Sequence, residues 1–314
     1  MSIGIALSPF GLDASDNAVD AAVVLGKEAA AVGVSSLWFG QLFSHDTIGL
    51  AGIVGREVPE LEVGTSVVPI AARHPLLMSS QAQTAQAATH GRFTLGVGLG
   101  ARFLTESAFG APYDRPIARL REFLAALRGV LANGEVEFRG ETLTAVTPMP
   151  AVVAGAEPTV PVLVAAMGPQ ALRVTAELAD GTMPFLVGPQ ALAEHIVAPI
   201  TAAAEQAGRP RPRIVAMVPG VVTADVDTAR ATATEQMAFY NDIPSYKRMI
   251  ELSGASHAAD LAVIGDERAL ADQIAAYFDA GATDVVVAQT DLATDADRRR
   301  TWQVLGELNR ARTA

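Results

Sequence analysis

Residues 64–100 hold the pattern that decides the fold. They run Gly64-Thr65-Ser66-Val67-Val68-Pro69, then Arg73-His74-Pro75, a helix-like segment, and Gly91-Arg92-Phe93-Thr94-Leu95-Gly96-Val97-Gly98-Leu99-Gly100. This order predicts a strand, a turn, a helix that begins at a proline, a glycine stop and a second strand. Both strands end in small residues, which let a flat ligand approach the backbone closely.

The same alternation of strand-like and helix-like segments extends along the whole chain. The strand candidates are short apolar or β-branched runs at 2–8, 35–40, 61–68, 93–98, 160–166, 181–186, 213–222 and 283–289. We assign one following helix to each, at 16–32, 46–55, 75–90, 114–132, 169–179, 189–207, 225–240 and 266–280. Apolar strands between amphipathic helices indicate a parallel sheet with a covered outer face. Eight such units predict an α/β fold of the (β/α)8 TIM barrel type.

We expect one barrel domain over residues 1–314, because no linker-like segment divides the chain. Such barrels usually need about 250 residues, which leaves room for insertions. The expected insertions are the Gly-, Pro- and Thr-rich segment 133–159 and the segment 241–262 before the last strand. Ligand chemistry in this fold is expected on the loops that follow the strands.

The predicted helix ends have recognisable capping residues. Three aspartates are expected N-caps, namely Asp16, Asp225 and Asp266. Pro75 suits the first turn of a helix. Three glycines follow the last helical residues, where a left-handed backbone favours glycine: Gly33, Gly91 and Gly281.

Composition excludes several classes of function. A net charge of −11 argues against nucleic acid as a partner, since its binding needs a basic surface. The chain has no cysteine, which removes disulfides, thiol nucleophiles and iron–sulfur clusters, and its five histidines lack metal-ligand spacing. Lys27 and Lys247 do not lie at strand ends, so Schiff-base chemistry is not expected. The first residues do not resemble a signal peptide and no apolar run is long enough for a membrane helix, so we expect a cytoplasmic protein without a membrane partner.

Motifs at the predicted strand ends occur in a familiar order. They are Leu37-Trp38-Phe39-Gly40-Gln41-Leu42-Phe43-Ser44-His45-Asp46, Gly64-Thr65-Ser66-Val67-Val68-Pro69, Gly96-Val97-Gly98-Leu99-Gly100-Ala101, Val162-Leu163-Val164-Ala165-Ala166-Met167-Gly168-Pro169-Gln170 and Ala179-Asp180-Gly181-Thr182-Met183-Pro184-Phe185. With this order the chain resembles the luciferase-like monooxygenase superfamily, and within it the branch that uses the deazaflavin coenzyme F420. The resemblance implies hydride transfer between C5 of the deazaflavin ring and a small organic substrate such as an activated alkene, imine, alcohol or carbonyl. It also implies a homodimer.

The resemblance assigns cofactor-binding roles at three strand ends. Residues expected to border or approach the ring are Ser66, Val67, Gly98, Gly100, Thr182 and Met183. In the resembling family a non-proline cis peptide bond faces the ring, and the matching bond here is Ser66–Val67. The segment expected to hold the phosphate-bearing tail consists of Ala165, Ala166, Met167, Gly168, Pro169 and Gln170. Backbone N–H groups at Gly168 and Gln170 suit a phosphate, since a helix N-terminus carries unpaired donors and a partial positive charge.

The end of the second strand departs from the family pattern. Many relatives have an acidic residue and a histidine at the positions of Gly40 and Gln41. Gln41 can hydrogen-bond a ring edge but cannot titrate, whereas His45 can supply a proton near neutral pH. Gln41 and His45 are therefore the candidate catalytic residues, and His45 could equally be a residue at a helix start beside Asp46.

The glycines at residues 96–100 also satisfy the G-x-G-x-x-A pattern of dinucleotide-binding folds. That fingerprint requires a helix directly after the glycines, and the next strong helical pattern begins only near Asp114. We therefore reject a Rossmann fold. Relatives that act on sugar phosphates have a carboxylate at the position of Ala101, so sugar-phosphate dehydrogenase activity is not expected.

Three alternative functions share this sequence pattern. An FMN-dependent luciferase-like monooxygenase would use the same motifs, because FMN also has a tricyclic ring and a phosphate. A non-catalytic flavin-binding barrel would be consistent with the missing acidic–histidine pair. A lyase or isomerase without a redox cofactor is the third, although no metal or base cluster occurs at the strand ends.

Overall fold

The computed structural model describes residues 2–8, 11–12 and 14–313, and its central feature is a closed parallel barrel. The strands are β1 (Ser2–Leu7), β2 (Ser36–Phe39), β3 (Glu62–Thr65) continued by β4 (Val68–Pro69), β5 (Phe93–Gly98), β8 (Val162–Val164), β9 (Gly181–Thr182), β10 (Arg213–Val222) and β12 (Asp284–Ala288). Each pairs in parallel with the next, and β12 returns to β1. The predicted (β/α)8 barrel is confirmed.

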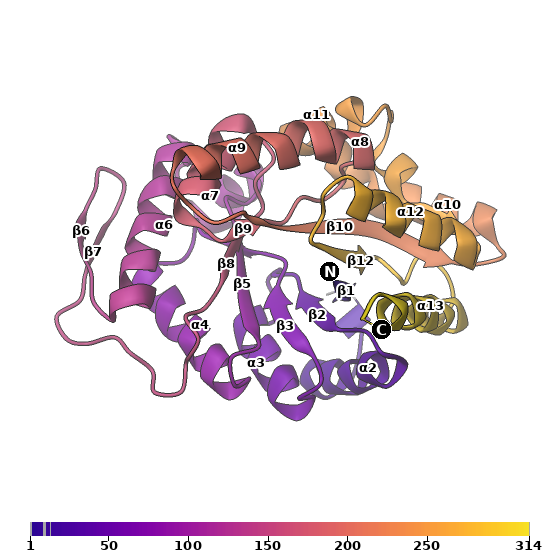
Figure 1. The fold of residues 1–314 in the computed structure, drawn as a ribbon, viewed down its shortest axis with the longest axis horizontal. Helices are drawn as coiled ribbons and strands as arrows, with labels where there is room; N and C mark the ends of the chain where they lie inside the picture. Colours follow the sequence, from indigo (N-terminus) through magenta and orange to yellow (C-terminus); the bar gives the residue numbers. More distant parts are fainter. Residues whose placement is uncertain (1, 9–10, 13, 314) are drawn as a thin grey trace.

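Helices form an outer ring around these strands (Figure 1). They are α2 (Ala18–Val32), α3 (Thr47–Glu57), α4 (Pro75–Ala88), α6 (Pro116–Asn133), α7 (Pro169–Leu178), α8 (Pro189–Leu192), the π-helical turn η1 (Ala193–Val197), α9 (Ala198–Gln206), α12 (Glu267–Asp279) and α13 (Asp295–Thr313). The assignment of 266–280 to the last strand was wrong: α12 precedes β12, and α13 follows it. Charged residues cluster at the start of α13, so its sequence did not indicate a helix, although it buries Trp302 and Leu305.

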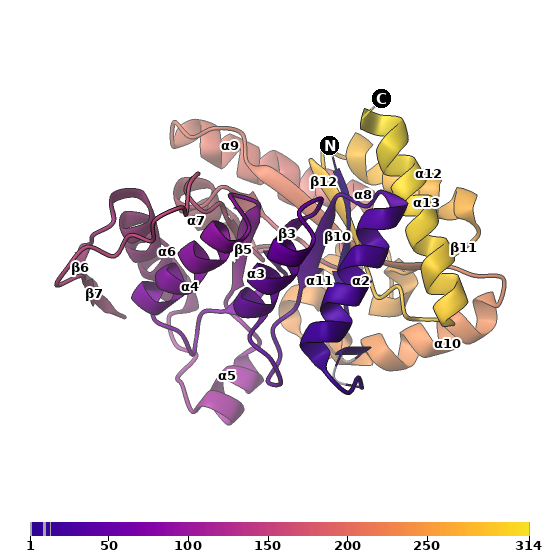
Figure 2. The same ribbon diagram turned by 90° about the horizontal axis from the view of Figure 1, so that it is seen from below.

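Further elements extend beyond the two ends and sides of the barrel. At the carboxyl ends of the strands lie α5 (Arg102–Phe109), α10 (Val226–Met237), the 3-10 turn η2 (Ala238–Asp242) and α11 (Pro244–Leu252), followed by η3 (Ala258–Leu261) and β11 (Val263–Gly265), which pairs with β10. A hairpin of β6 (Glu137–Arg139) and β7 (Thr144–Val146) projects from the side. In Figure 2, α5 and α10 lie at the lower edge and the N-terminus at the upper edge.

Capping follows the predicted residues with one correction. Asp225 and Asp266 cap α10 and α12 through their side chains, as predicted. The N-cap of α2 is Asn17 and not Asp16, because the amide oxygen of Asn17 accepts from the backbone N–H groups of Val19 and Asp20. The three glycines predicted to end helices all have positive φ: Gly33 (93°), Gly91 (85°) and Gly281 (101°).

Successive side chains of a strand point to opposite sides, so the core has one part inside the barrel and one part between the barrel and the helices. On β10, Val215 and Met217 face the barrel interior, whereas Ile214, Ala216 and Val218 face the helices. The interior cluster consists of Ala6, Trp38, Leu163, Met183, Val215, Met217, Val286 and Ala288. Among the described residues, no helix combines the length and the apolar character that a membrane span requires.

An ion pair closes the barrel at the amino ends of the strands. Arg213 Nε lies 2.8 Å from Asp284 Oδ2, and Asp284 also accepts from the hydroxyls of Ser2 and Thr283. Burial alone would raise the pKa of Asp284, but the hydrogen bonds and charge of Arg213 outweigh it and lower that pKa. Charged and polar groups therefore connect the strands at this end of the barrel.

Candidate functional site at the carboxyl ends of the strands

Two parts of the barrel could receive a ligand. A cleft of about 550 Å³ lies at the amino ends of the strands, lined by residues that include Asp180, Arg209, Arg213 and Phe278. Barrels of this type carry their chemistry at the opposite, carboxyl end, where the loops vary without disturbing the packed interior. We therefore built the candidate site at that end, which we call the mouth.

The strand predicted at 61–68 is interrupted at the mouth. The Ser66–Val67 peptide bond is cis, as the family resemblance implied. The backbone N–H of Ser66 donates to Phe39 O at 2.7 Å, and the Thr65 hydroxyl bonds across to Gly96. Val67 packs against the interior cluster. The interruption therefore directs the Val67 side chain into the mouth.

Gly98 and Ala165 lie beside Val67. A Cβ atom built on Gly98 would lie 2.9 Å from Val67 Cγ2 and 3.5 Å from Ala165 Cβ. Gly100 follows with φ +78°, a conformation that glycine adopts without strain. The structure thus brings together three predicted cofactor residues, Val67, Gly98 and Ala165. We call the surface that they form the ring slot.

The start of α7 has unused hydrogen-bond donors. Gly168 is its N-cap and no side chain caps the helix. Among the described residues, the backbone N–H groups of Gly168 and Gln170 have no acceptor. A Cβ on Gly168 would meet nothing within 4 Å, so the approach is open. Pro169 has no N–H, and Ala166 and Met167 are buried below the turn. This arrangement suits an anionic group.

Thr182 and Met183 support the same region from β9. The Thr182 hydroxyl lies 2.9 Å from both Val164 O and Ala166 O, so it fixes the end of β8. Met183 is 2% exposed and belongs to the interior cluster. Thr182 therefore holds the ring slot in place from below.

Both the nitrogen and the oxygen of the Gln41 side-chain amide form hydrogen bonds that hold the β2–α3 loop. Its Nε2 donates to Leu42 O and His45 O, and its Oε1 accepts from Thr47 and from Arg73. To bond a cofactor ring, Gln41 would have to exchange one of these partners. Arg73 also binds Asp46 at 2.8 Å, and sequence reasoning did not single it out. Its position between the β2 and β4 loops makes it a positioning residue of the mouth.

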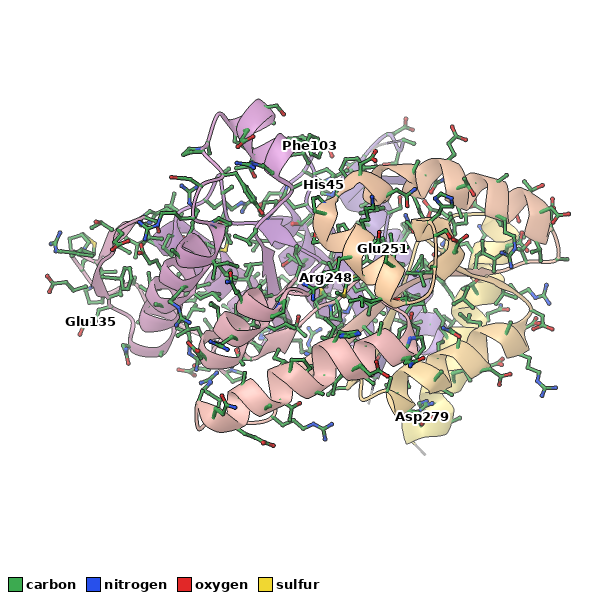
Figure 3. The ribbon with its side chains drawn as sticks, turned by 90° about the horizontal axis from the view of Figure 1, so that it is seen from above. His45, Phe103, Glu135, Arg248, Glu251 and Asp279 are labelled. Carbon is green, nitrogen blue, oxygen red and sulfur yellow. The ribbon has the colours of Figure 1, made fainter. Side chains whose placement is uncertain are left out.

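The predicted proton donor, His45, lies in the same loop. Its side chain is partly exposed, and its Nδ1 is 3.1 Å from the Ser44 hydroxyl. Figure 3 labels His45 and Phe103 on this face of the barrel, with α11 marked by Arg248 and Glu251. The partly exposed histidine is therefore accessible at the mouth.

A helix follows the glycines at 96–100 directly. Helix α5 begins directly after Ala101, so the expected absence of a helix there was wrong. Its aromatic residues Phe103 and Phe109 are exposed, which removed the core-facing stripe that signals a helix. The closed barrel topology itself excludes the Rossmann fold.

Aromatic side chains border the mouth on the side of η2 and α11. The ring centroid of Phe185 lies 5.3 Å from that of Tyr240 and 6.1 Å from that of Tyr246. Phe185 also packs against the interior cluster. Burial raises the pKa of both tyrosines. We call Phe185, Tyr240 and Tyr246 the aromatic wall, which long separations in sequence had concealed.

Two pairs of phenylalanine side chains also contact each other at the mouth. Phe103 on α5 contacts Phe239 of η2 at 5.5 Å, and Phe43 contacts Phe109 at 5.8 Å. Within the part of the chain that the structure describes, no group of three or more His, Asp or Glu side chains is arranged to hold a metal ion. Aromatic side chains therefore line part of the opening, beside the polar loop of Gln41, His45 and Arg73.

Fold and site together define a (β/α)8 barrel with closely packed small residues at its strand ends and a helix start without a side-chain cap. The chain belongs to the luciferase-like monooxygenase family, whose model matches residues 1–284. An uncharacterised protein of Mycobacterium tuberculosis (strain H37Rv) is 30% identical over 249 residues, which cover 76% of this chain and 72% of that protein.

Solved structures show the same fold with different cofactors in their descriptions. The coenzyme F420-dependent tetrahydromethanopterin reductase of Methanopyrus kandleri has a TM-score of 0.77 at 21% identity, and the match covers 100% of this chain and 99% of that one. The oxygenating constituent of 3,6-diketocamphane monooxygenase from Pseudomonas putida, in complex with FMN, has a TM-score of 0.78 at 15% identity over 98% and 97%. At these identities the likeness concerns the fold.

Proposed function

We propose that this protein is a coenzyme F420-dependent oxidoreductase that transfers a hydride between the deazaflavin C5 and a small organic substrate. The observation that carries the proposal is the ring slot of Val67, Gly98 and Ala165 beside the uncapped start of α7. A side chain at Gly98 would collide with Val67, and the free N–H groups of Gly168 and Gln170 match a phosphate. The residues present therefore fit a flat ring with an anionic tail.

Each residue has a defined part in this proposal. When bound, the deazaflavin supplies hydride transfer at its C5 position. Val67 and Gly98 border one face of the ring, and Met183 supports the slot from the interior. Gly168 and Gln170 hold the phosphate through their backbone N–H groups. The aromatic wall limits access of water to the reacting carbon.

A proton must accompany hydride transfer to a carbonyl or an imine. We assign its donation to His45, because Gln41 cannot titrate and its amide is engaged in the loop. Gln41 and Arg73 then act by fixing the loop that presents His45. The matching test is His45→Gln, which keeps the hydrogen-bonding capacity and removes the titrating group.

The test of this proposal uses two assays on the same preparation. Oxidised F420 is mixed with secondary alcohols such as propan-2-ol and cyclohexanol, and loss of the oxidised ring absorbance is followed. We expect turnover that His45→Gln lowers by about a hundredfold or more, the usual contribution of a general acid or base, without a change in cofactor binding. Full activity of His45→Gln would remove the histidine from the mechanism.

The FMN-dependent monooxygenase is the second candidate, because a solved structure with this fold binds FMN. Reduced FMN is supplied in the presence of oxygen and the same substrates, and oxygen consumption is recorded. Substrate-dependent oxygen consumption, with no reaction of F420, would replace the deazaflavin proposal. Tight cofactor binding without turnover of any substrate would favour a non-catalytic flavin-binding barrel.

A further inference from the structure

The segment Arg209-Pro210-Arg211-Pro212-Arg213 connects α9 to β10 at the amino end of the barrel. Proline fixes its own φ and restricts the residue before it to an extended backbone, so Arg209 and Arg211 are both biased toward extension. In an extended chain, alternate residues point to the same side. The sequence therefore favours three arginines on one side of this segment, and all three line the cleft at the amino ends of the strands.

This cleft lies at the opposite end of the barrel from the mouth. In Figure 2, α9, which precedes the arginine segment, lies at the upper edge with the N-terminus, whereas α5 lies at the lower edge. The cleft has a volume of about 550 Å³. Small-molecule sites usually have roughly 300–1,000 Å³. The cleft is therefore large enough for a small organic molecule that does not reach the mouth.

Arg213 lines the cleft, but its charge is used by the fold. Its Nε lies 2.8 Å from Asp284 Oδ2, and its Nη2 lies 3.5 Å from Glu62 Oε2. The Thr283 hydroxyl, which belongs to a residue of the same lining, is engaged with Asp284 and with the backbone of Ile214. We therefore assign neither group to a ligand.

Arg209 is fixed at the cleft and keeps free donors. Its Nη2 donates to Ala179 O at 3.0 Å and lies 3.4 Å from Asp180 Oδ1. Asp180 also lies 3.2 Å from Arg128, so two arginines neutralise one carboxylate. Among the described residues, Arg209 Nη1 has no hydrogen-bond acceptor. One positive charge therefore remains uncompensated beside a guanidinium that is already positioned.

Arg211 has no structural partner. Its side chain is exposed, and within residues 2–8, 11–12 and 14–313 it forms no hydrogen bond and no ion pair. The prolines on both sides leave its backbone little freedom. The charged residues of the lining are three arginines and Asp180, in a chain whose net charge is −11. A local excess of positive charge with unpaired guanidinium donors suits an anion.

The chemistry of the two available guanidinium groups selects the anion. A guanidinium presents paired N–H donors that match the oxygens of a phosphate or a carboxylate. Arg209 and Arg211 offer donors from two positions, and a terminal phosphate group has three oxygens to accept them, whereas a carboxylate has two. Pro210 and Phe278 in the same lining supply apolar surface for the rest of the molecule.

We propose that the cleft at the amino end of the barrel is a second ligand site, which binds a small organic phosphate monoester. Arg209 and Arg211 hold the phosphate, and the apolar body lies against Pro210 and Phe278. A ligand there connects the α9–β10 segment with residues 281–283 between α12 and β12, because both line the cleft. The site is independent of the proposed function, since it shares no residue with the ring slot, the start of α7 or the loop of His45.

The test compares three probes: phenyl phosphate, inorganic phosphate and benzoate. Their dissociation constants are measured by isothermal titration calorimetry on the cofactor-free protein at low ionic strength, because salt screens exposed charges. Inorganic phosphate lacks the apolar body, and benzoate has one negative charge and two oxygens. We expect phenyl phosphate to bind about tenfold more tightly than either of them and to raise the melting temperature.

Two variants and a control locate the probe. Arg211→Gln removes the charge from a side chain without structural partners and should weaken phenyl phosphate about tenfold. Arg211→Lys keeps the charge but loses the paired donors, and should weaken it about threefold. Arg268→Gln on α12, where the arginine side chain is 88% exposed, removes the same charge elsewhere and should change nothing. All three variants should bind F420 as the wild type does.

The outcomes separate this inference from the proposed function. No binding of phenyl phosphate, unchanged affinity in Arg211→Gln, or an equal loss in Arg268→Gln overturns the second site. Tighter binding of benzoate overturns the assignment to a phosphate. Displacement of phenyl phosphate by F420 to the same extent in the wild type and in Arg211→Gln places the probe in the mouth, and also overturns the second site. Failure to bind F420 or FMN overturns the proposed function alone, because the probes are compared on the cofactor-free protein.

Discussion

Replacement of Gly98 by alanine adds a single methyl group to the ring slot. The new Cβ would lie 2.9 Å from Val67 Cγ2, whereas carbon atoms at optimal contact are about 3.5–4.0 Å apart. Val67 must therefore move by roughly 0.6–1 Å. Extra methyl groups in well-packed regions usually cost about 1–3 kcal/mol, and partly buried Val67 can turn toward the open mouth. We expect a loss of about 1 kcal/mol in the free energy of unfolding of the cofactor-free protein.

Cofactor binding removes the space into which Val67 would turn. The penalty then falls on affinity, and a penalty of about 1.4–3 kcal/mol corresponds to roughly 10- to 150-fold weaker binding. The assay is equilibrium titration of F420 and of FMN by fluorescence, with chemical denaturation of the cofactor-free protein alongside.

A matched control separates this effect from general overpacking. In Gly129→Ala on α6, the new Cβ would also lie 2.9 Å from a valine Cγ2, that of Val136, but far from the mouth. This variant should bind either cofactor as the wild type does. Unchanged affinity of Gly98→Ala would refute the assignment of the ring slot.

Three further predictions concern stability. Asp284→Asn should lower the free energy of unfolding by about 1–3 kcal/mol at pH 7, less than for a fully buried pair because Arg213 is 26% exposed. The pKa of Asp284 is depressed, so the stabilisation is present above the usual pKa of 3.8 and is lost as the pH falls through the folded-state pKa. A difference between the two proteins that persists at low pH in urea titrations would contradict this. Gln289→Gly should raise the free energy of unfolding by about 1 kcal/mol, and with it the melting temperature, because glycine adopts φ +51° freely and one unpaired acceptor is removed. A lower melting temperature than that of the wild type would be inconsistent with this reasoning. Gln41→Leu should lower the free energy of unfolding, measured by chemical denaturation, by about 1–3 kcal/mol, since Arg73 and the β2–α3 loop lose their shared hydrogen-bond partner. A change below about 0.5 kcal/mol would show that the loop does not depend on Gln41.

The barrel was predictable because its strands are apolar on both faces. Runs such as 213–222 and 283–289 read as buried strands without any partner information, and β10 and β12 occupy them closely. Helix α13 could not be read in the same way. Its first turns are dominated by Asp295, Asp297 and three arginines, and only the tertiary contact of Trp302 with Thr290 shows which face is buried.

The ring slot was found from glycines, whereas the aromatic wall was not. Gly98 and Gly168 lie in short motifs directly after strands, so local sequence identifies them. Phe185, Tyr240 and Tyr246 come together only when α10 carries the chain back across the mouth. The unpaired oxygens of Gln289 and Asp291 likewise depend on what surrounds them in space and leave no signal in the sequence.

The measurement that tests the central claim most directly is equilibrium binding of oxidised F420 and of FMN to the same cofactor-stripped protein. The account predicts micromolar or tighter binding of F420, much weaker binding of FMN, and loss of F420 affinity in Gly98→Ala but not in Gly129→Ala. Preference for FMN would contradict the deazaflavin assignment and move the protein to the monooxygenases. Binding of neither cofactor would contradict the site itself.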